Sequence, residues 1–254
     1  MVLPLLSSVI GVAATCLLAA GAVRSGAFTL LAGVVATIFG SFIVIVAGYP
    51  YLALLVLFVV ASVLATRFRF EDKRRKGVQE GTHGERGVAN VLAHVVVLTG
   101  LVGLSWTLPG FLPAATTAFL YMAALAFGAS DTFASEFGVL AGRARSLLTG
   151  RRVEPGTNGG VSALGEAWAF VGAFTTAVVG AGLFHLFTQP APPVGTLLLG
   201  VTLAGFLGCQ VDSLIGETLE NRRWLSKGGT NLVAMFITVL MAWGLLMALG
   251  PGLG

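Results

Sequence analysis

Charge is the scarcest property of this sequence, because only 10% of its 254 residues are Asp, Glu, Lys or Arg. A soluble domain carries about 25% charged residues. Hydrophobic residues make up 56% of the chain, and the mean hydropathy is +0.91. The composition therefore excludes an ordinary soluble core and predicts an integral membrane protein.

Other absences limit the chemistry. The two cysteines, Cys16 and Cys209, both lie in apolar runs and predict neither a disulfide nor a metal motif. No Walker A pattern occurs, which excludes a P-loop nucleotide site. His83, His94 and His185 lack the spacing of metal ligands, so structural or solvated roles are expected. The net charge of +4 is explained by orientation in the membrane and by anionic lipid, so no nucleic-acid partner is expected.

Long apolar runs are what the sequence has in abundance. A bilayer core about 30 Å thick needs about 20 apolar residues per helix. Runs of this kind occupy residues 2–23, 26–47, 49–66, 88–107, 112–132, 161–187, 194–214 and 231–250. The predicted fold class is all-α, a polytopic transmembrane helix bundle with eight spans. Seven spans is the alternative count, because the first three runs are crowded.

The whole chain, 1–254, is predicted to form one transmembrane domain. Three N-terminal helices (1–66), the first of them a retained helix rather than a signal peptide, precede a basic loop (67–87). One repeat with its loop follows (88–160), and then a second (161–254). With eight spans, all 15 Lys and Arg residues fall on one side of the membrane. The positive-inside rule predicts that this side is cytoplasmic and that both termini lie outside.

An internal repeat carries most of the acidic residues found in apolar surroundings. "GASDTFASEFGVL" at 128–140 contains Asp131 and Glu136, and "GCQVDSLIGE" at 208–217 contains Asp212 and Glu217. A basic loop, a Gly-rich Thr-Asn turn and an apolar helix follow each Asp-x4-Glu pair. Both copies have the same orientation relative to the membrane, which indicates a parallel duplication.

Carboxylates at membrane depth are costly and usually mark a functional site. The four carboxylates of the repeat predict a Mg²⁺ site, because Mg²⁺ prefers carboxylates together with substrate phosphates. Five residues of regular helix separate two side chains by about 140°. Either the helix therefore ends or bulges between Asp and Glu, or each reaches a different partner. The more specific expectation is that Asp131 and Asp212 face each other and bind the metal. For Glu136 and Glu217 the alternative is that they pair with loop arginines.

The Gly-rich turns precede helices, whose starts suit phosphate. Glycine also lets a backbone approach a ligand closely. The alternative is that Thr and Asn are ordinary helix caps. Residues expected to contact nucleotide or lipid phosphate are Arg86, Asn90, Gly156, Thr157, Asn158, Gly159, Gly160, Lys227, Gly228, Gly229, Thr230 and Asn231.

From about residue 67 to 250 the motifs "ERGVANVLAH", "DTFASEFGVL", "PGTNGGVSALG" and "DSLIGETLE" with "KGGTN" resemble the integral-membrane family that includes plant phytyl-phosphate kinase. That family is distantly akin to CTP-dependent phytol and dolichol kinases. The resemblance implies transfer of a phosphoryl group from a nucleoside triphosphate, with CTP the expected donor, to phytyl, geranylgeranyl or a similar isoprenyl monophosphate. The product would be the diphosphate.

Two other functions remain open from the residues. A CTP-dependent lipid cytidylyltransferase would use the same metal and nucleotide but release pyrophosphate. A secondary transporter also uses repeats and intramembrane carboxylates, although transporter sites tend to lie near the bilayer midplane.

Overall fold

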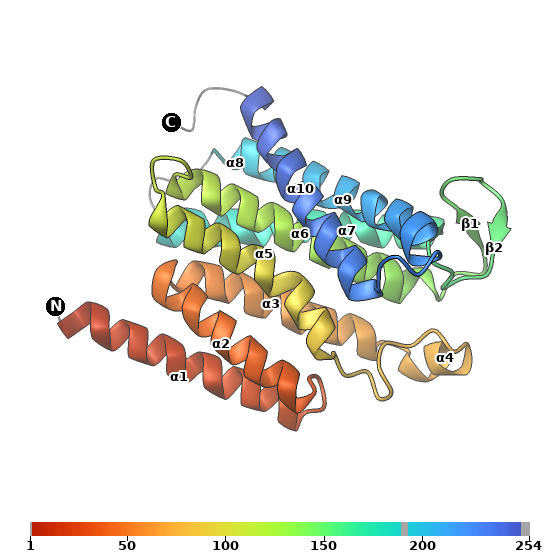
Figure 1. Ribbon diagram of the computed structural model, residues 1–254, viewed down its shortest axis with the longest axis horizontal. Coiled ribbons are helices and arrows are strands. Elements are labelled where there is room, and N and C mark those ends of the chain that lie inside the picture. The colour runs from red at the N-terminus through yellow and green to blue at the C-terminus, as the bar shows by residue number, and fades with distance from the viewer. Residues whose placement is uncertain (1, 189–192, 250–254) are drawn as a thin grey trace.

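The computed structural model describes residues 2–188 and 193–249, so most of the segment between the predicted spans 161–187 and 194–214 and the last residue of the final predicted span lie outside the described residues. The chain forms a helix bundle (Figure 1). Its long helices are α1 (Val2–Arg24), α2 (Leu30–Val46), α3 (Tyr49–Arg67), α5 (Val88–Thr107), α6 (Ala114–Gly138), α7 (Ala163–Phe187), α9 (Thr202–Ile215) and α10 (Lys227–Leu249). The shorter helices are α4 (Phe70–Arg75) and α8 (Val194–Thr196), and two π-helical turns, η1 (Leu197–Val201) and η2 (Gly216–Glu220), extend α9 at either end.

The predicted polytopic helical membrane protein is confirmed, and each predicted apolar run coincides with a helix. Within the described residues, six helical segments are long and apolar enough to cross a membrane. They are Leu6–Arg24, Tyr49–Arg67, Val88–Thr107, Ala163–Phe187, Val194–Glu220 and Lys227–Ala248. The apolar helix α2 is shorter, at 17 residues.

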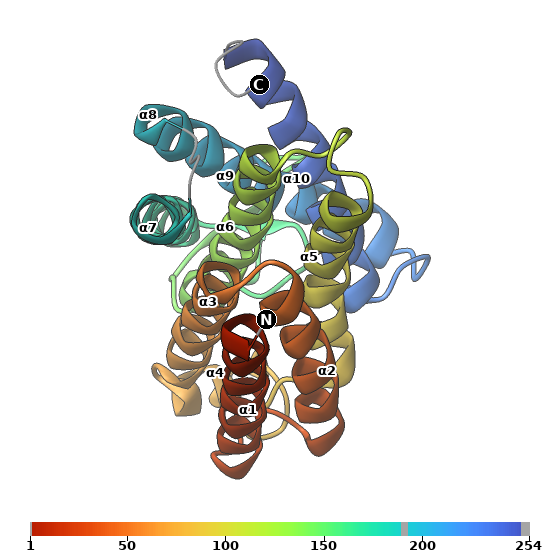
Figure 2. The same cartoon turned by 90° about the vertical axis from the view of Figure 1, so that its left-hand side faces the viewer.

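Helix α6 is 25 residues long and is absent from that apolar set because it is rich in small and polar residues. It occupies the centre of the bundle (Figure 2), and its residues 115–130 are all buried. Close packing requires small residues on its neighbours. A Cβ atom on Gly172 of α7 would lie 2.6 Å from the Ala129 carbonyl oxygen, and one on Gly205 of α9 would lie 2.6 Å from Ala126 Cβ. The carboxylate-bearing helices α6 and α9 therefore pack inside the bundle through small residues.

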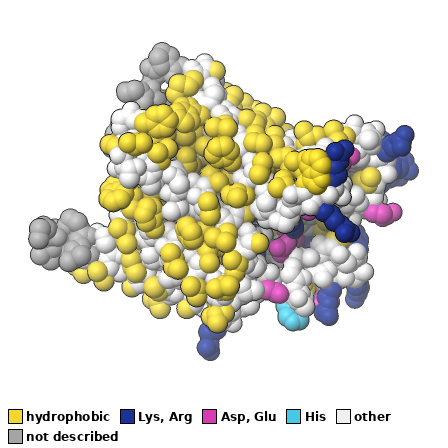
Figure 3. Space-filling view, in the orientation of Figure 1, with side chains coloured by type: hydrophobic (Ala, Val, Ile, Leu, Met, Phe, Trp, Pro, Cys, Tyr) yellow, Lys and Arg dark blue, Asp and Glu magenta, His cyan; other side chains and the backbone are white. Residues whose placement is uncertain are grey.

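One end of the bundle carries α4, the loops that flank it, and the connections α6–α7 and α9–α10; we call it the charged end. Lys and Arg gather there, while hydrophobic side chains cover most of the rest of the same face (Figure 3). The α6–α7 connection, predicted as a basic loop, folds into a small antiparallel sheet of β1 (Ala144–Ser146), β2 (Arg152–Val153) and β3 (Gly160–Val161) in the order β2-β1-β3. The protein is therefore nearly, but not entirely, all-α.

Candidate functional site

A polar cavity of about 290 Å³ opens at the charged end, between α6, α9, the start of α10, the turn before β3 and the loop after α4. It brings together many of the residues that the sequence analysis predicted, although they lie far apart in the chain. Those that line it are Asp131, Glu136, Gly156, Thr157, Asn158, Gly159, Gly160, Asp212, Lys227 and Asn231.

Asp131 and Asp212 meet on the wall of this cavity. Helices α6 and α9 pack against each other, and the two carboxyl groups lie within hydrogen-bonding distance. Two carboxylates this close repel each other unless they share a proton or a cation lies beside them. Asp212 Oδ1 is buried and has no hydrogen-bond partner among the described residues. The pair therefore has an oxygen free for a ligand, and its chemistry fits a hard cation.

The rest of a metal shell is not supplied by the protein. Within residues 2–188 and 193–249, no group of three or more His, Cys, Asp or Glu side chains is placed to hold a metal ion. Mg²⁺ commonly uses only one or two protein carboxylates and takes its remaining ligands from water and substrate phosphates. Asp131 and Asp212 fit that pattern.

Glu136 lines the same cavity as the aspartate pair but is engaged in a buried ion pair of its own. Its Oε2 atom lies 2.7 Å from Lys73 Nζ, and the Lys73 side chain is 0% exposed. Lys73 also donates to the carbonyl groups of Ala65 and Thr66, and the Thr66 hydroxyl donates to Glu136 Oε1 at 2.6 Å. Both charges are thus satisfied inside the protein. Although Glu136 lines the cavity, both of its oxygens are bound by Thr66 and Lys73, so it pairs with a lysine rather than with the loop arginine given as the alternative.

Glu217 is also engaged elsewhere. It lies in the π-helical turn η2, accepts hydrogen bonds from the Ser146 hydroxyl and the Leu148 backbone N–H, and so anchors the sheet of the α6–α7 connection. Gly159 packs directly on it, since a Cβ atom there would lie 2.3 Å from Glu217 Cβ. The four predicted metal-binding carboxylates therefore separate into one facing pair and two structural anchors.

The first Gly-rich turn was expected to lie directly before a helix. It lies on the cavity, but no helix begins there. Ser162 caps α7 by accepting a hydrogen bond from the Gly165 N–H at 3.0 Å, and strand β3 intervenes between the turn and the helix. Gly156 and Gly159 have φ angles of +94° and +74°, a region that favours glycine. Asn158 donates to Glu220 Oε1 at 3.0 Å, which ties the turn to η2.

The second Gly-rich motif is also placed differently, because α10 begins at Lys227 and not at residue 231. The Ser226 hydroxyl accepts a hydrogen bond from the Gly229 N–H, so Ser226 has the position expected of a cap. Gly228 packs against Ala89 of α5, and Gly229 and Thr230 do not line the cavity. Asn231, one turn further on, reaches it.

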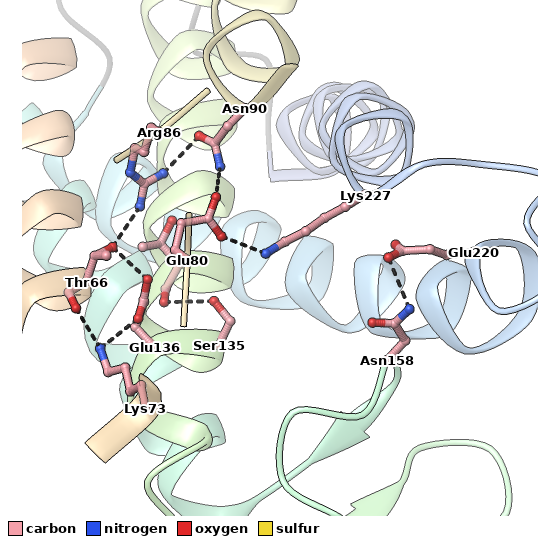
Figure 4. Close-up of polar contacts among 11 residues, drawn as sticks. Thr66, Lys73, Glu80, Arg86, Asn90, Ser135, Glu136, Asn158, Glu220 and Lys227 are labelled. Carbon is pink, nitrogen blue, oxygen red and sulfur yellow. Dashed lines mark hydrogen bonds and ion pairs between the residues drawn. The ribbon is translucent and has the colours of Figure 1, made fainter. Parts of the chain in front are cut away.

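Glu80, in the loop before α5, joins several of the predicted residues (Figure 4). Its carboxylate accepts hydrogen bonds from Lys227 Nζ at 2.9 Å and Asn90 Nδ2 at 3.4 Å. Arg86 donates to Asn90 Oδ1 at 3.0 Å and to the Thr66 hydroxyl at 3.5 Å. Arg86 and Asn90 thus stand behind the cavity wall and do not line it.

Charges in this network act on one another. Burial raises the pKa of Glu80, but the charge of Lys227, its hydrogen bond, Arg86 and Asn90 outweigh that effect and hold the pKa below its usual value. Burial lowers the pKa of Arg86, and the carboxylates of Glu80, Glu136 and Asp131 oppose that shift. For both Glu80 and Arg86, neighbouring groups of opposite charge therefore counteract the effect of burial on the pKa.

Several residues around the site were not singled out from the sequence. Lys73 stands in the run "KRRK", where nothing distinguishes the one buried lysine from its solvated neighbours. Glu80 lies in a charged loop and Glu220 at the end of η2, and neither belongs to an Asp-x4-Glu pair. Only the fold reveals these partners. Glu166 differs, because its position near the inner end of the sixth predicted span already made it a candidate for the site; it lines the cavity and accepts a hydrogen bond from Gln210 at 2.9 Å.

Comparisons with known proteins place the chain in a family. The model of the family described as integral membrane protein DUF92 matches residues 13–240. An uncharacterised membrane protein of Methanocaldococcus jannaschii is 30% identical over 207 residues, covering 79% of this chain and 78% of the relative. One from Synechocystis is 31% identical over 204 residues, covering 77% and 73%.

The Protein PGR of Arabidopsis thaliana is 33% identical over 190 residues, covering 68% of this chain and 66% of the relative. None of these three names states an activity. No solved structure matches the chain. The match over most of its length shows that this protein belongs to the DUF92 family of integral membrane proteins.

Proposed function

We propose that this protein is a Mg²⁺-dependent isoprenyl-phosphate kinase. It would transfer the terminal phosphoryl group of a nucleoside triphosphate, CTP being the expected donor, to phytyl, geranylgeranyl or a similar isoprenyl monophosphate. The observation that carries the proposal is the facing pair Asp131 and Asp212 on the wall of a polar cavity whose other walls hold a glycine turn and Lys227. Phosphoryl transfer depends mainly on positioning and charge neutralisation, and these are the groups it needs.

Each part of the cavity has a role in this reaction. Asp131 and Asp212 would hold Mg²⁺, which when bound neutralises phosphate charge. The turn at residues 156–160 forms part of the cavity wall, where its backbone would lie against a phosphate. Lys227, whose side chain is 63% exposed beside Glu80, can reorient to contact phosphate, and Asn231 offers an amide.

In the proposed reaction an oxygen of the lipid phosphate attacks the γ-phosphorus of the nucleotide. The bond between the γ-phosphorus and the oxygen bridging to the β-phosphate breaks, and the nucleoside diphosphate leaves with the electron pair. The acceptor phosphate is already ionised at neutral pH, so the site needs no strong general base. The charge of the two phosphate groups is what the cavity must offset.

The test is transfer by purified protein in detergent, with Mg²⁺, CTP or ATP labelled in the γ-phosphate, and phytyl or geranylgeranyl monophosphate. Labelled lipid diphosphate and unlabelled nucleoside diphosphate are expected. Release of labelled pyrophosphate would instead identify the cytidylyltransferase. Substrate uptake into liposomes without nucleotide would identify the transporter, and folded protein inactive with every pair of substrates would contradict the kinase.

A matched set of variants locates the site. Asp131→Asn and Asp212→Asn remove one charge each from the facing pair, whereas Asp72→Asn removes a charge from an exposed ion pair with Arg69 on α4. Loss of transfer in the first two, with activity retained in the third, is expected. Equal activity in all three would remove the aspartate pair from the mechanism.

A further inference from the structure

Two connecting segments meet at the polar cavity. Residues 77–80, which follow α4, line one wall, and the turn at residues 156–160 lines another. The two segments touch, because a Cβ atom on Gly156 would lie 2.5 Å from Val78 Cγ1. Glycine thus leaves the room that the Val78 side chain fills. We call residues 76–81 the strap; it joins the α4 side of the cavity to the α6–α7 connection.

The chain on either side of the strap is firmly held. Before it, the Lys73 side chain is 0% exposed and forms the buried ion pair with Glu136. After it, the Arg86 backbone N–H donates to the Ala27 carbonyl at 2.9 Å, which fixes the chain to the loop between α1 and α2. The strap is therefore a short segment between two anchors.

The strap itself has little regular structure. It contains no helix or strand, and Gly77 and Gly81 near its ends have φ angles of +70° and +61°. Among the described residues, Gln79 and Glu80 form no backbone-to-backbone hydrogen bond. Because glycine crosses φ/ψ space at little cost, Gly77 and Gly81 can act as hinges.

Among the described residues, the hydrogen bonds that tie the strap to other parts of the cavity all come from side chains. Lys76 Nζ donates to the Val139 carbonyl at 3.0 Å. Glu80 accepts from Lys227 Nζ at 2.9 Å and from Asn90 Nδ2 at 3.4 Å (Figure 4). The Lys227 side chain is 63% exposed, and exposed ion pairs contribute little to stability because water competes for both charges. These ties can break without disturbing the helix bundle.

The size of the cavity requires one of its walls to move. Its volume is about 290 Å³, whereas sites that enclose a single drug-sized ligand measure roughly 300–1,000 Å³. The proposed reaction needs a nucleoside triphosphate and the phosphate of a lipid in the same space. The other walls are long helices and a turn that Asn158 ties to Glu220 of η2, so the strap is the wall best able to move.

We propose that the strap opens to admit the nucleotide at the charged end and closes behind it. Opening separates Val78 from Gly156 and Glu80 from Lys227, which frees the lysine for phosphate. Closure excludes water from the reacting phosphates, as loop closure does in many transferases. The inference rests on the proposed function for the identity of the ligand, but opening belongs to the chain and requires no substrate.

A native cysteine can report the opening. Cys209 lines the cavity and is 2% exposed, whereas Cys16, the other cysteine, is exposed on α1. The experiment uses full-length protein carrying Cys16→Ser, purified in detergent, and follows the rate at which a cationic, water-soluble methanethiosulfonate reagent labels Cys209. Slow labelling is expected, because only the open state exposes the thiol. Mg²⁺ with CTP or ATP should slow it further, and labelling unchanged by saturating amounts of both would overturn the role of the strap in nucleotide binding.

Variants of the strap separate opening from general loosening. Val78→Ala should speed labelling about fourfold, the change in an opening equilibrium expected from the loss of about one buried CH₂ group. Glu80→Gln should speed it about twofold, since it weakens an exposed ion pair. The control is Val63→Ala, the same truncation at a partly buried valine of α3 outside this cavity. A control rate equal to that of Val78→Ala would overturn the inference, and so would labelling that neither strap variant changes.

Failure of this inference is distinguishable from failure of the proposed function. Faster labelling in Val78→Ala, in a protein that transfers phosphate from no nucleotide, would leave the strap standing and remove the kinase. Transfer of phosphate by a protein whose Cys209 labelling ignores the strap variants would keep the kinase and remove the strap.

Discussion

The two Asp-x4-Glu copies begin alike in sequence and end with different surroundings. In the first copy α6 continues without interruption to Gly138, six residues beyond its predicted end, so Asp131 and Glu136 lie on different sides of one regular helix. In the second copy α9 changes to a π-helical turn at Gly216, between Asp212 and Glu217. The aspartates nevertheless meet across the α6–α9 contact, and the glutamates diverge.

The divergence shows that one repeated motif can contain both a residue that faces a cavity and a residue that anchors a connecting segment. The aspartates face a shared space, where one oxygen has no hydrogen-bond partner among the described residues, as a ligand site requires. The glutamates each hold one connection in place, the α3–α4 segment through Lys73 and the β-sheet connection through Ser146. The two expected outcomes of helix geometry, a bulge between the carboxylates and different partners for each, both occur.

The largest effect should come from breaking the aspartate pair. Asp131→Asn or Asp212→Asn is expected to lower the transfer rate at least ~10³-fold, because metal-centred charge stabilisation supplies several kcal/mol and each 1.36 kcal/mol is a factor of ten. The measurement is initial rate at saturating substrates. The thermal unfolding temperature should not fall, since relieving repulsion between carboxylates does not destabilise the fold. A loss of activity accompanied by unfolding would count against the proposed role.

The next largest effect should be on stability, in the first copy. Glu136→Gln leaves the charge of Lys73, which is 0% exposed, buried without its counter-ion. Breaking a buried pair in this way costs about 3–5 kcal/mol. The control is Glu71→Gln, which breaks an exposed pair with Arg74 and should change stability by less than about 0.5 kcal/mol. Equal stabilities in denaturant unfolding would show that the buried pair is not an anchor.

A smaller effect is expected in the second copy. Glu217→Gln weakens the charged hydrogen bonds to Ser146 and the Leu148 N–H, each of a kind worth about 1.5–3 kcal/mol. The sheet over residues 144–161 should then be cleaved faster in limited proteolysis, while the transmembrane helices stay protected. Glu154→Gln, in the same exposed connection, is the control. Unchanged cleavage would contradict the anchoring role of Glu217.

The smallest effect concerns pH and Glu80. Its pKa is lowered in the folded protein, so its contribution to stability is fully present above the pKa of the unfolded chain, about 4.3, and is lost as pH falls through the lower folded value. Because Lys227 is largely exposed, the contribution should not exceed about 1 kcal/mol. The difference in stability between the wild type and Glu80→Gln should therefore be constant from pH 5 to 7 and vanish in stronger acid. A difference that grows in acid would have the wrong sign.

Much of the fold was predictable because the relevant signals are local. Membrane helices need long apolar runs, and each run became a helix. The boundaries were less accurate, since α6 extends into polar residues that are buried by neighbours, and α10 starts at a cap four residues earlier than predicted. The small sheet was missed because its strands are two or three residues long and depend on Glu217, which lies 71 residues after Ser146 in the chain.

The sequence by itself determined that this protein lies in a membrane, where its helices run, that its charges gather at one end, and that Asp131 and Asp212 are the residues to examine. These follow from composition, periodicity and a repeat, all of which are read along the chain. Only the tertiary structure decided which carboxylates share a cavity and that Lys73 neutralises Glu136. Those outcomes depend on side chains brought together from distant segments, and the direction of a side chain within a bundle is set by packing that no local pattern contains.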